Sequence, residues 1–324
     1  MNPFTGAPDS WESEETQAVL SWALREAHGA DARLEAWTAD VDFTRYGKRR
    51  VVRYSVEARL AHAPELQRFE WVGKVYERDD DARRVAGVLQ TLATRRDGGC
   101  GRLTAPRVVA YHASRRLLLV TYEPGESVTS AIGSEAAAVL QALGCSLAAL
   151  HTSGLTVGPL RTPAALLAEL RPRIADLCTR FPGDAAFLRD SLDRLEQDAP
   201  LLPPTPSFVH GDFGPANLLW IAGHIVVLDF DKCARGDPAL DLGNLLAQLR
   251  RMSVCKPDRL PDFAAARRGV LAAYHGSSPP DPDLRQRLAW YELATLLRKV
   301  HRLALTATCD EATRLLRLCG SHAA

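Results

Sequence analysis

The sequence has no excess charge of either sign, no paired cysteines and no long apolar run. Its 324 residues include 40 Lys plus Arg and 39 Asp plus Glu, so the formal net charge is +1. This balance gives no global field that would attract nucleic acid or an acidic membrane surface. The seven cysteines are scattered and form no C-x-x-C pair, which argues against a zinc site or a disulfide framework and indicates reduced thiols.

Neither the first residues nor any later segment predicts export or membrane insertion. The N-terminal stretch is acidic and lacks the apolar centre of a signal peptide, and no later run approaches the length that spans a bilayer. We therefore expect a cytoplasmic protein that acts on a small molecule and has no nucleic-acid or membrane partner. The length predicts two domains, and 46% apolar residues are enough for a sizeable core.

A glycine-rich phosphate loop is also missing. The first hairpin loop, around residues 43–50, has one glycine, Gly47, and matches neither G-x-G-x-x-G nor G-x-x-x-x-G-K-[ST]. Lys48, Arg49 and Arg50 could contact phosphate there, but basic hairpin tips are more often simply solvated.

The hydrophobic pattern changes near residue 124. Strand-like alternation runs from about residue 34 to residue 122 and is interrupted by one helix over residues 80–96. After Pro124-Gly125 the chain becomes chiefly helical, apart from two short strands over residues 216–221 and 224–230. We predict an α+β fold with a small N-terminal antiparallel β lobe that contains one helix, followed by a larger, mainly helical C-terminal lobe.

The most informative stretch is HGDFGPANLLW, residues 210–220. It places Asp212 and Asn217 in a loop broken by Gly and Pro, and the apolar hairpin that follows ends in Asp229. Alone, Asp212 would be an ordinary turn residue. Together the three side chains offer oxygen ligands of the kind that Mg²⁺ prefers, with room left for phosphate oxygens and water. The array predicts phosphoryl transfer, and we expect His210 to be structural rather than a base.

The spacing is close to that of protein kinases, in which H-R-D-x-x-x-x-N is followed by D-F-G. Here Gly211 replaces the Arg, and the second motif reads D-F-D at residues 229–231. In this spelling, and in the segments ARGDPALDLGNLL (234–246) and LAALH (147–151), the chain resembles the aminoglycoside phosphotransferase and choline kinase family. The resemblance covers roughly residues 34–250.

The resemblance implies a protein-kinase-like fold and phosphorylation of small-molecule hydroxyl groups by ATP with Mg²⁺. Residues 1–122 would form the nucleotide-binding lobe, and residues 123–324 would form the catalytic and substrate-binding lobe. Asp212 would orient the substrate hydroxyl, while Asn217 and Asp229 would bind the metal. The acceptor could be a sugar, an amino alcohol, an aminoglycoside or another metabolite.

Lys74 lies in the middle of a predicted strand ahead of a helix and matches the lysine that binds nucleotide phosphates in kinases. An isolated strand lysine would otherwise be merely solvated. The family carries a Glu on the next helix to pair with this lysine, but Val85 stands at that position. Either Asp79, Asp80 or Asp81 replaces the Glu, or the pairing is absent.

The segment LLLVTYEPGES, which ends at Ser127, resembles the hinge of the family. Adenine in kinase-like folds is bound by main-chain groups, so the resemblance points to the Thr121 carbonyl and the Glu123 amide, with Tyr122 between them.

Other interpretations remain at this stage. The Asp229 region, HIVVLDFDKC, also resembles the start of a haloacid-dehalogenase-type phosphatase, although Cys233 stands where a hydroxyl residue is expected. The missing helix Glu leaves a nucleotide-binding pseudokinase as another alternative. Asp237 is explained by helix capping before Pro238, and Asp241 could either brace the loop or face substrate.

Charge gives one indication about the acceptor. From residue 281 onward there are seven Lys or Arg and five acids, so the C-terminal part shows no acidic enrichment of the kind expected for a polycationic antibiotic. An antibiotic-resistance role is therefore not favoured by charge.

Overall fold

The computed structural model describes residues 14–40, 50–94, 103–201, 203, 205–306 and 309–320. These residues form two compact units. Unit 1 contains the described residues up to 94 together with residues 105–124, and unit 2 contains residues 103–104 and everything described from 125 onward. The glycine and basic residues at 47–49 lie outside the described residues.

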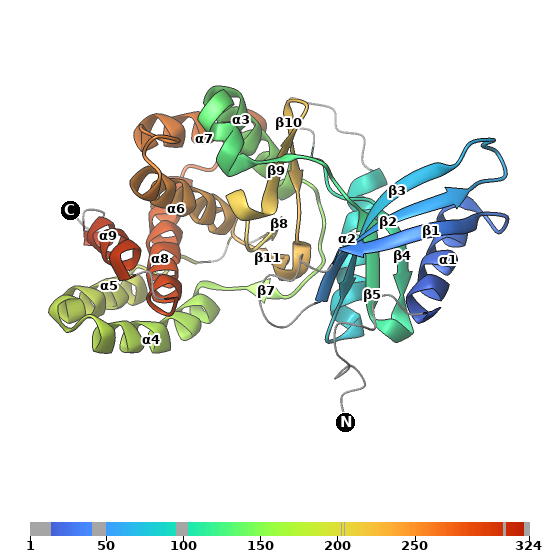
Figure 1. Cartoon of the computed structure of the whole chain (residues 1–324). Coiled ribbons are helices and arrows are strands. Elements are labelled where there is room, and N and C mark those ends of the chain that lie inside the picture. Colours follow the sequence, from blue (N-terminus) through green and yellow to red (C-terminus); the bar gives the residue numbers. More distant parts are fainter. Residues whose placement is uncertain are drawn as a thin grey trace. The chain divides into compact units, whose positions relative to one another are not determined.

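Unit 1 contains a five-stranded antiparallel sheet in the order β1-β2-β3-β5-β4 (Figure 1). Alternation along β2 places Val52, Tyr54 and Val56 in the buried core, as the period-2 pattern predicts. The strands are β1 Arg33–Asp40, β2 Arg50–Arg59, β3 Gln67–Val75, β4 Val108–His112 and β5 Leu117–Thr121.

Two helices pack on this sheet, so the expectation of one helix in the N-terminal lobe is wrong. The predicted helix is α2, Asp79–Thr94, which contacts β4 and β5. The additional helix is α1, Glu14–His28, which contacts β1 and β4 and buries Leu20 and Leu24 in the core of the sheet. Its buried residues recur at helical spacing, and it has acidic residues in its first turn and basic ones in its last, so the signal was present in the sequence.

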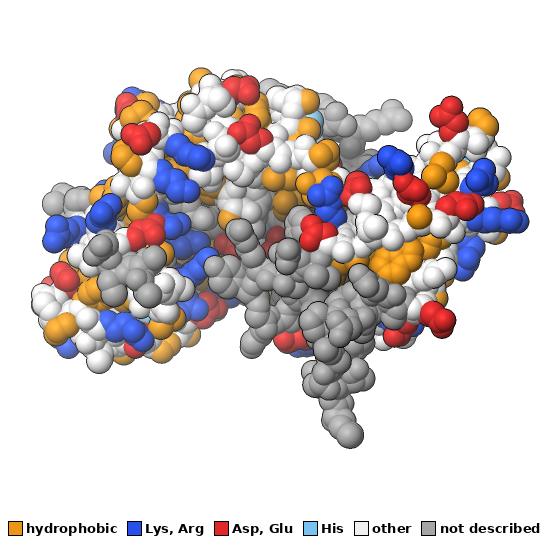
Figure 2. Space-filling model, in the orientation of Figure 1, with side chains coloured by type: hydrophobic (Ala, Val, Ile, Leu, Met, Phe, Trp, Pro, Cys, Tyr) orange, Lys and Arg blue, Asp and Glu red, His pale blue; other side chains and the backbone are white. Residues whose placement is uncertain are grey.

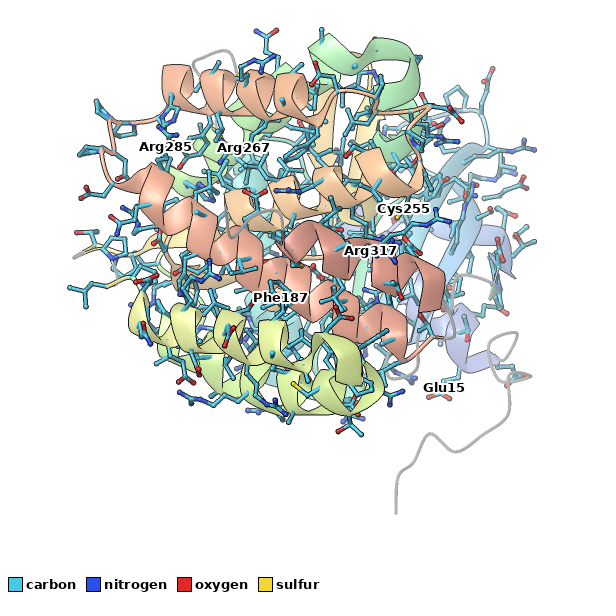
Figure 3. The ribbon with its side chains drawn as sticks, turned by 90° about the vertical axis from the view of Figure 1, so that its left-hand side faces the viewer. Glu15, Phe187, Cys255, Arg267, Arg285 and Arg317 are labelled. Carbon is cyan, nitrogen blue, oxygen red and sulfur yellow. The ribbon has the colours of Figure 1, made fainter. Side chains whose placement is uncertain are left out.

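Unit 2 is mainly helical. In Figure 3, α7, α6 and α8 lie one below another, with α4 and α5 beneath them, and contacts join each successive pair. The most apolar helix, α3, is long enough to cross a membrane, but 56% of its apolar window is buried inside the protein, as in a core helix. The helices are α3 Val128–His151, α4 Pro163–Arg180, α5 Ala185–Gln197, α6 Ala239–Cys255, α7 Phe263–Ser277, α8 Leu284–Ala304 and α9 Cys309–Gly320.

Unit 2 also contains two small sheets, ordered β10-β9-β6 and β7-β11-β8. Only β9 and β10 were expected from the sequence. The other four strands have two or three residues, which is too short to leave a hydrophobic period in the sequence. The strands are β6 Glu126–Ser127, β7 Leu160–Arg161, β8 Ser207–Val209, β9 Leu218–Ile221, β10 His224–Val227 and β11 Ala234–Gly236.

The β9–β10 hairpin positions the candidate site. Its two-residue turn, Ala222-Gly223, has positive φ at both residues (46° and 85°), which is the geometry of a type I′ turn and suits the twist of the strands. The register pairs Leu218 with Val227. The residues just before β9 and just after β10 are therefore neighbours in space.

Candidate active site

Asp241 of α6 supports the loop between β8 and β9 through hydrogen bonds to its main chain. The carboxylate of Asp241 is fully buried, and its Oδ2 accepts a hydrogen bond from the amide of His210 at 2.6 Å while Oδ1 accepts one from the amide of Gly211 at 2.9 Å. Hydrogen bonds from amides to a buried carboxylate are among the stronger ones in proteins. Of the two roles left open for Asp241, the structure shows bracing of the loop.

A histidine and a tyrosine support Asp241 in turn. His151 Nε2 lies 3.3 Å from Asp241 Oδ2, and His151 Nδ1 lies 3.0 Å from the Tyr274 hydroxyl oxygen. Burial raises the pKa of Tyr274, so its hydroxyl stays protonated. The tyrosine donates to Nδ1, and Nε2 is left to donate to the carboxylate.

Gly211 explains why this loop does not carry the Arg of protein kinases. The residue has φ of +78°, and a Cβ there would lie 2.3 Å from the carbonyl oxygen of Lys232. Both the left-handed backbone and the close approach require glycine.

His210 joins the loop to the end of the hairpin. It is fully buried, and its Nδ1 accepts from the amide of Asp212 at 3.2 Å, so its Nε2 donates to the carbonyl of Leu228 at 2.8 Å. Both ring nitrogens are thus occupied by main-chain groups, and the residue has the structural place that the sequence predicts.

The structure brings the segments of Asp212, Asn217 and Asp229 together. The Asn217 side chain donates from Nδ2 to the carbonyl of Asp212 at 3.0 Å. The carbonyl of Asn217 accepts from the amide of Leu228 at 2.9 Å, directly before Asp229. Asp229 is exposed and has a left-handed backbone, with φ of 59°. A non-glycine residue in that conformation is uncommon and concentrates at functional sites.

The donor set fits Mg²⁺ better than a structural metal. Within the described part of the chain, no group of three His, Cys, Asp or Glu side chains is placed to bind an ion. Asn217 and Asp229 together offer one amide oxygen and one carboxylate, and the bond from Nδ2 fixes which end of the amide carries the oxygen. Mg²⁺ is commonly held by such a small set, completed by water and substrate phosphates.

Asp212 is ion-paired in the structure. Lys232 Nζ lies 2.6 Å from Asp212 Oδ2, and the carboxylate is about one quarter exposed, at 24%. Burial acts to raise the pKa of Asp212, but Lys232, with smaller contributions from Lys299 and His210, outweighs it, so the pKa lies below its ordinary value. Asp212 is therefore ionised at neutral pH, as an acceptor of a hydroxyl proton must be.

Lys74 lies on β3 of unit 1, paired in register with Val51 of β2 and Leu118 of β5. Trp71 packs into the core of the sheet, which places Lys74 on the opposite face. The Lys74 ammonium lies 5.4 Å from the centroid of the Tyr76 ring.

The helix position that carries Glu in the family belongs to the core of unit 1, because Val85 is only 3% exposed. The three aspartates at the start of α2 have arginine partners close in sequence. These pairs are Asp79 with Arg83, Asp80 with Arg78 and Arg83, and Asp81 with Arg84.

The residues expected at the hinge are Thr121, the last residue of β5, and the two residues that follow it in unit 1. The Thr121 hydroxyl donates to Glu123 Oε1 at 2.6 Å, and the Tyr122 amide donates to the carbonyl of Glu70 at 2.9 Å. The guanidinium carbon of Arg53 lies 3.9 Å from the centroid of the Tyr122 ring. These contacts fix the side chains of the segment.

Asp237 does more than cap a helix, so the interpretation as a simple cap is wrong. Its Oδ1 accepts from the amide of Ala239 at 2.9 Å, but α6 takes Pro238 as its N-cap. The carboxylate is fully buried and also accepts from Arg287 Nε at 2.7 Å. Arg287 binds Asp281 as well and holds the pKa of that carboxyl below its ordinary value. Because Arg287 lies 50 residues after Asp237, no local sequence pattern indicates this ion pair.

A large cavity of about 990 Å³ lies in unit 2 but is not lined by Asp212, Asn217 or Asp229. Its lining includes His151, which contacts Asp241, and Tyr274, which contacts His151. The three oxygen-bearing side chains singled out from the sequence therefore lie outside this cavity.

Comparison with known proteins identifies the family. A model of the phosphotransferase enzyme family (APH) matches residues 62–288, well over half of the chain. The chain therefore belongs to the phosphotransferase enzyme family, as the resemblance predicted. No curated protein matches the sequence at a significant level.

Three solved structures illustrate the fold. A thermostable mutant of the aminoglycoside phosphotransferase APH(4)-Ia, in a ternary complex with ADP and hygromycin B, has a TM-score of 0.61 at 17% identity, covering 94% of this chain and 97% of its own. Amicoumacin kinase hAmiN, in complex with AMP-PNP, Ca²⁺ and Ami, has a TM-score of 0.61 at 15% identity, and the match covers 96% of this chain and 93% of that kinase. Choline kinase LicA from Streptococcus pneumoniae has a TM-score of 0.59 at 10% identity, and the match covers 95% of this chain and 99% of that kinase.

These neighbours confirm the protein-kinase-like α+β fold. The topology also argues against the phosphatase alternative, because Asp229 follows an antiparallel hairpin, β9–β10, instead of the first strand of a parallel sheet. The enzyme class is thus phosphotransferase.

Proposed function

We propose that this protein transfers the γ-phosphoryl group of Mg-ATP to a hydroxyl group of a small molecule. The observation that supports the proposal most directly is the juxtaposition of Asp212, Asn217 and the segment of Asp229 through two hydrogen bonds, of 3.0 and 2.9 Å. Neighbours with ADP or AMP-PNP bound support ATP as the donor. We also propose a cytoplasmic location, consistent with the free thiols of the five cysteines whose side chains the structure describes.

Asp212 orients the acceptor. Its ionised carboxylate accepts the hydroxyl proton while the acceptor oxygen forms a bond to the γ-phosphorus and the bond from that phosphorus to the β-phosphate oxygen breaks, releasing ADP. Because the transition state is loose, positioning contributes more than basicity. A low pKa for Asp212 is compatible with that role.

Asn217 and Asp229 are the proposed metal ligands. A bound Mg²⁺ would neutralise charge on the phosphate oxygens. The bracing of the loop by Asp241 and His210 keeps both ligand segments in register without reorganisation during turnover.

In unit 1 we propose that Lys74 contacts the nucleotide phosphates, and that the main chain of Thr121 and Glu123, with Tyr122 between them, binds adenine. This assignment extends the family pattern to these positions. It makes residues 1–122 the nucleotide-binding lobe and residues 123–324 the catalytic and substrate-binding lobe.

The test is ADP release from Mg-ATP with a panel of hydroxylated small molecules, measured above the background without acceptor. Turnover of at least one acceptor is expected, and Asp229→Ala should abolish it while the protein stays folded, because Asp229 is exposed. Retained turnover in that variant would refute the metal role. Nucleotide binding without any turnover would instead favour the pseudokinase alternative.

A further inference from the structure

Cations gather around Asp212 in unit 2. Lys232 is in contact with its carboxylate, and Arg298 and Lys299 of α8 both interact electrostatically with it. Arg302, one turn further along the helix, adds to the positive charge at Lys299. Figure 2 shows Lys and Arg side chains over α6 and α8 on the drawn face of this unit.

Arg298 and Lys299 are not in direct contact with a carboxylate among the described residues, although Asp212 acts on both of them electrostatically and Glu169 acts on Arg298. Neither makes an ion pair or a hydrogen bond there with its side chain, although both are partly buried. By contrast, the nearby Arg161 and Arg173 share Glu169, at 2.7 and 3.8 Å. Burial, with Arg302, Arg298 and Lys232 adding to it, lowers the pKa of Lys299 to about 8. Partly buried cations side by side repel each other and are poorly solvated, so an anion beside them would be stabilised.

Three of the described acids at or near the C-terminal helices are engaged or buried elsewhere. Asp281 is paired with Arg287, Glu311 with Arg251, and Glu292 is fully buried. Asp283 immediately precedes α8. At a rise of 1.5 Å per residue, Asp283 is about 24 Å along the helix axis from Lys299. None of these carboxylates is placed to offset the charge at Arg298 and Lys299.

We propose that the phosphoryl acceptor carries an anionic group, a carboxylate or a phosphate, and that Arg298 and Lys299 bind it while Asp212 receives the hydroxyl. This inference rests on the proposed phosphotransfer function. An anionic acceptor gains two counter-ions, whereas an acceptor with an ammonium group would meet Lys232, Arg298 and Lys299 around Asp212. Specificity of this kind combines attraction of one charge with repulsion of the other.

Matched acceptors test the charge preference. Two triplets keep the hydroxyl group and vary the charge: glucuronate, glucose and glucosamine, and glycolate, ethylene glycol and ethanolamine. With Mg-ATP, the anionic member should have the highest kcat/KM. Lys299→Gln and Arg298→Gln should each lower kcat/KM for the anionic member about 10- to 100-fold, the loss expected for one charged hydrogen bond.

Arg285→Gln is the matched control, because Arg285 is exposed near the other end of the same helix (Figure 3). It should leave the preference unchanged. Turnover of a neutral or ammonium-bearing member as efficient as that of the anionic one overturns the inference but leaves phosphotransfer intact. Failure of every acceptor together with failure to bind Mg-ATP would count against the proposed function instead.

A second measurement does not depend on turnover. The chain has only five lysines, at 48, 74, 232, 256 and 299. Pyridoxal 5′-phosphate forms an imine with an unprotonated lysine, releasing water, and borohydride reduces it to a stable adduct that mass spectrometry can map. At pH 8, Lys299 should be labelled faster by pyridoxal 5′-phosphate than by pyridoxal, and inorganic phosphate should protect it. Equal labelling by both reagents, or no protection, would overturn the anion site.

Discussion

Gly211→Ala adds one methyl group at the tightest point of the catalytic loop. The new Cβ would lie 2.3 Å from the Lys232 carbonyl oxygen, so the two segments must separate by about 0.7 Å or more to reach even 3.0 Å. The left-handed conformation at this residue costs alanine a further ~1–2 kcal/mol. Since a displacement near 1 Å at a reacting group costs on the order of 100-fold in rate, we expect kcat to fall by about that factor.

Gly223→Ala provides the control for backbone strain. Gly223 also has positive φ, at +85°, but a Cβ there meets nothing within 4 Å. The control should lose only the ~1–2 kcal/mol of strain and keep its activity, whereas Gly211→Ala should lose more stability and nearly all turnover. Urea unfolding and ADP release measure the two effects. Equal stability and equal activity of the two variants would refute the argument from the Lys232 contact.

Three further predictions follow from charged groups of unit 2. The pKa of Asp212 is lower in the folded protein than in the unfolded chain. Its pairing with Lys232 therefore stabilises the folded state at pH values above the unfolded pKa, and this stabilisation is lost as the pH falls through the folded pKa. Asp212→Asn should accordingly flatten the loss of stability below about pH 4 in acid titrations. Arg287→Met leaves the buried Asp237 unpaired and should cost about 3–5 kcal/mol in urea unfolding. Asp229→Gly suits the left-handed backbone, so it should keep or raise stability by up to ~1 kcal/mol while ADP release is lost.

The loop chemistry could be predicted from the sequence because it is local. Asp212 and Asn217 are five residues apart, and the apolar hairpin up to Asp229 specifies its own return path through strand alternation and a two-residue turn. The main strands and α2 follow from the same periodic signals. The missed α1 carried such a signal, whereas the short strands of unit 2 did not.

The charges that surround the site could not be predicted in this way. Lys232, Arg298 and Lys299 approach Asp212 from a 3₁₀ turn and a distant helix, and only tertiary packing brings them together. The count of charges from residue 281 onward showed no acidic enrichment but did not reveal which acids were already paired. The role of Asp241 was likewise open, because its hydrogen bonds reach amides 30 and 31 residues away.

Binding of Mn²⁺, as a paramagnetic substitute for Mg²⁺, with the ATP analogue AMP-PNP tests the central claim most directly. Electron paramagnetic resonance should show nucleotide-dependent Mn²⁺ binding in the unmodified protein and in Asp212→Asn, and weak or no binding in Asn217→Ala and Asp229→Ala. Equal binding in all four proteins would contradict a metal site built from Asn217 and Asp229.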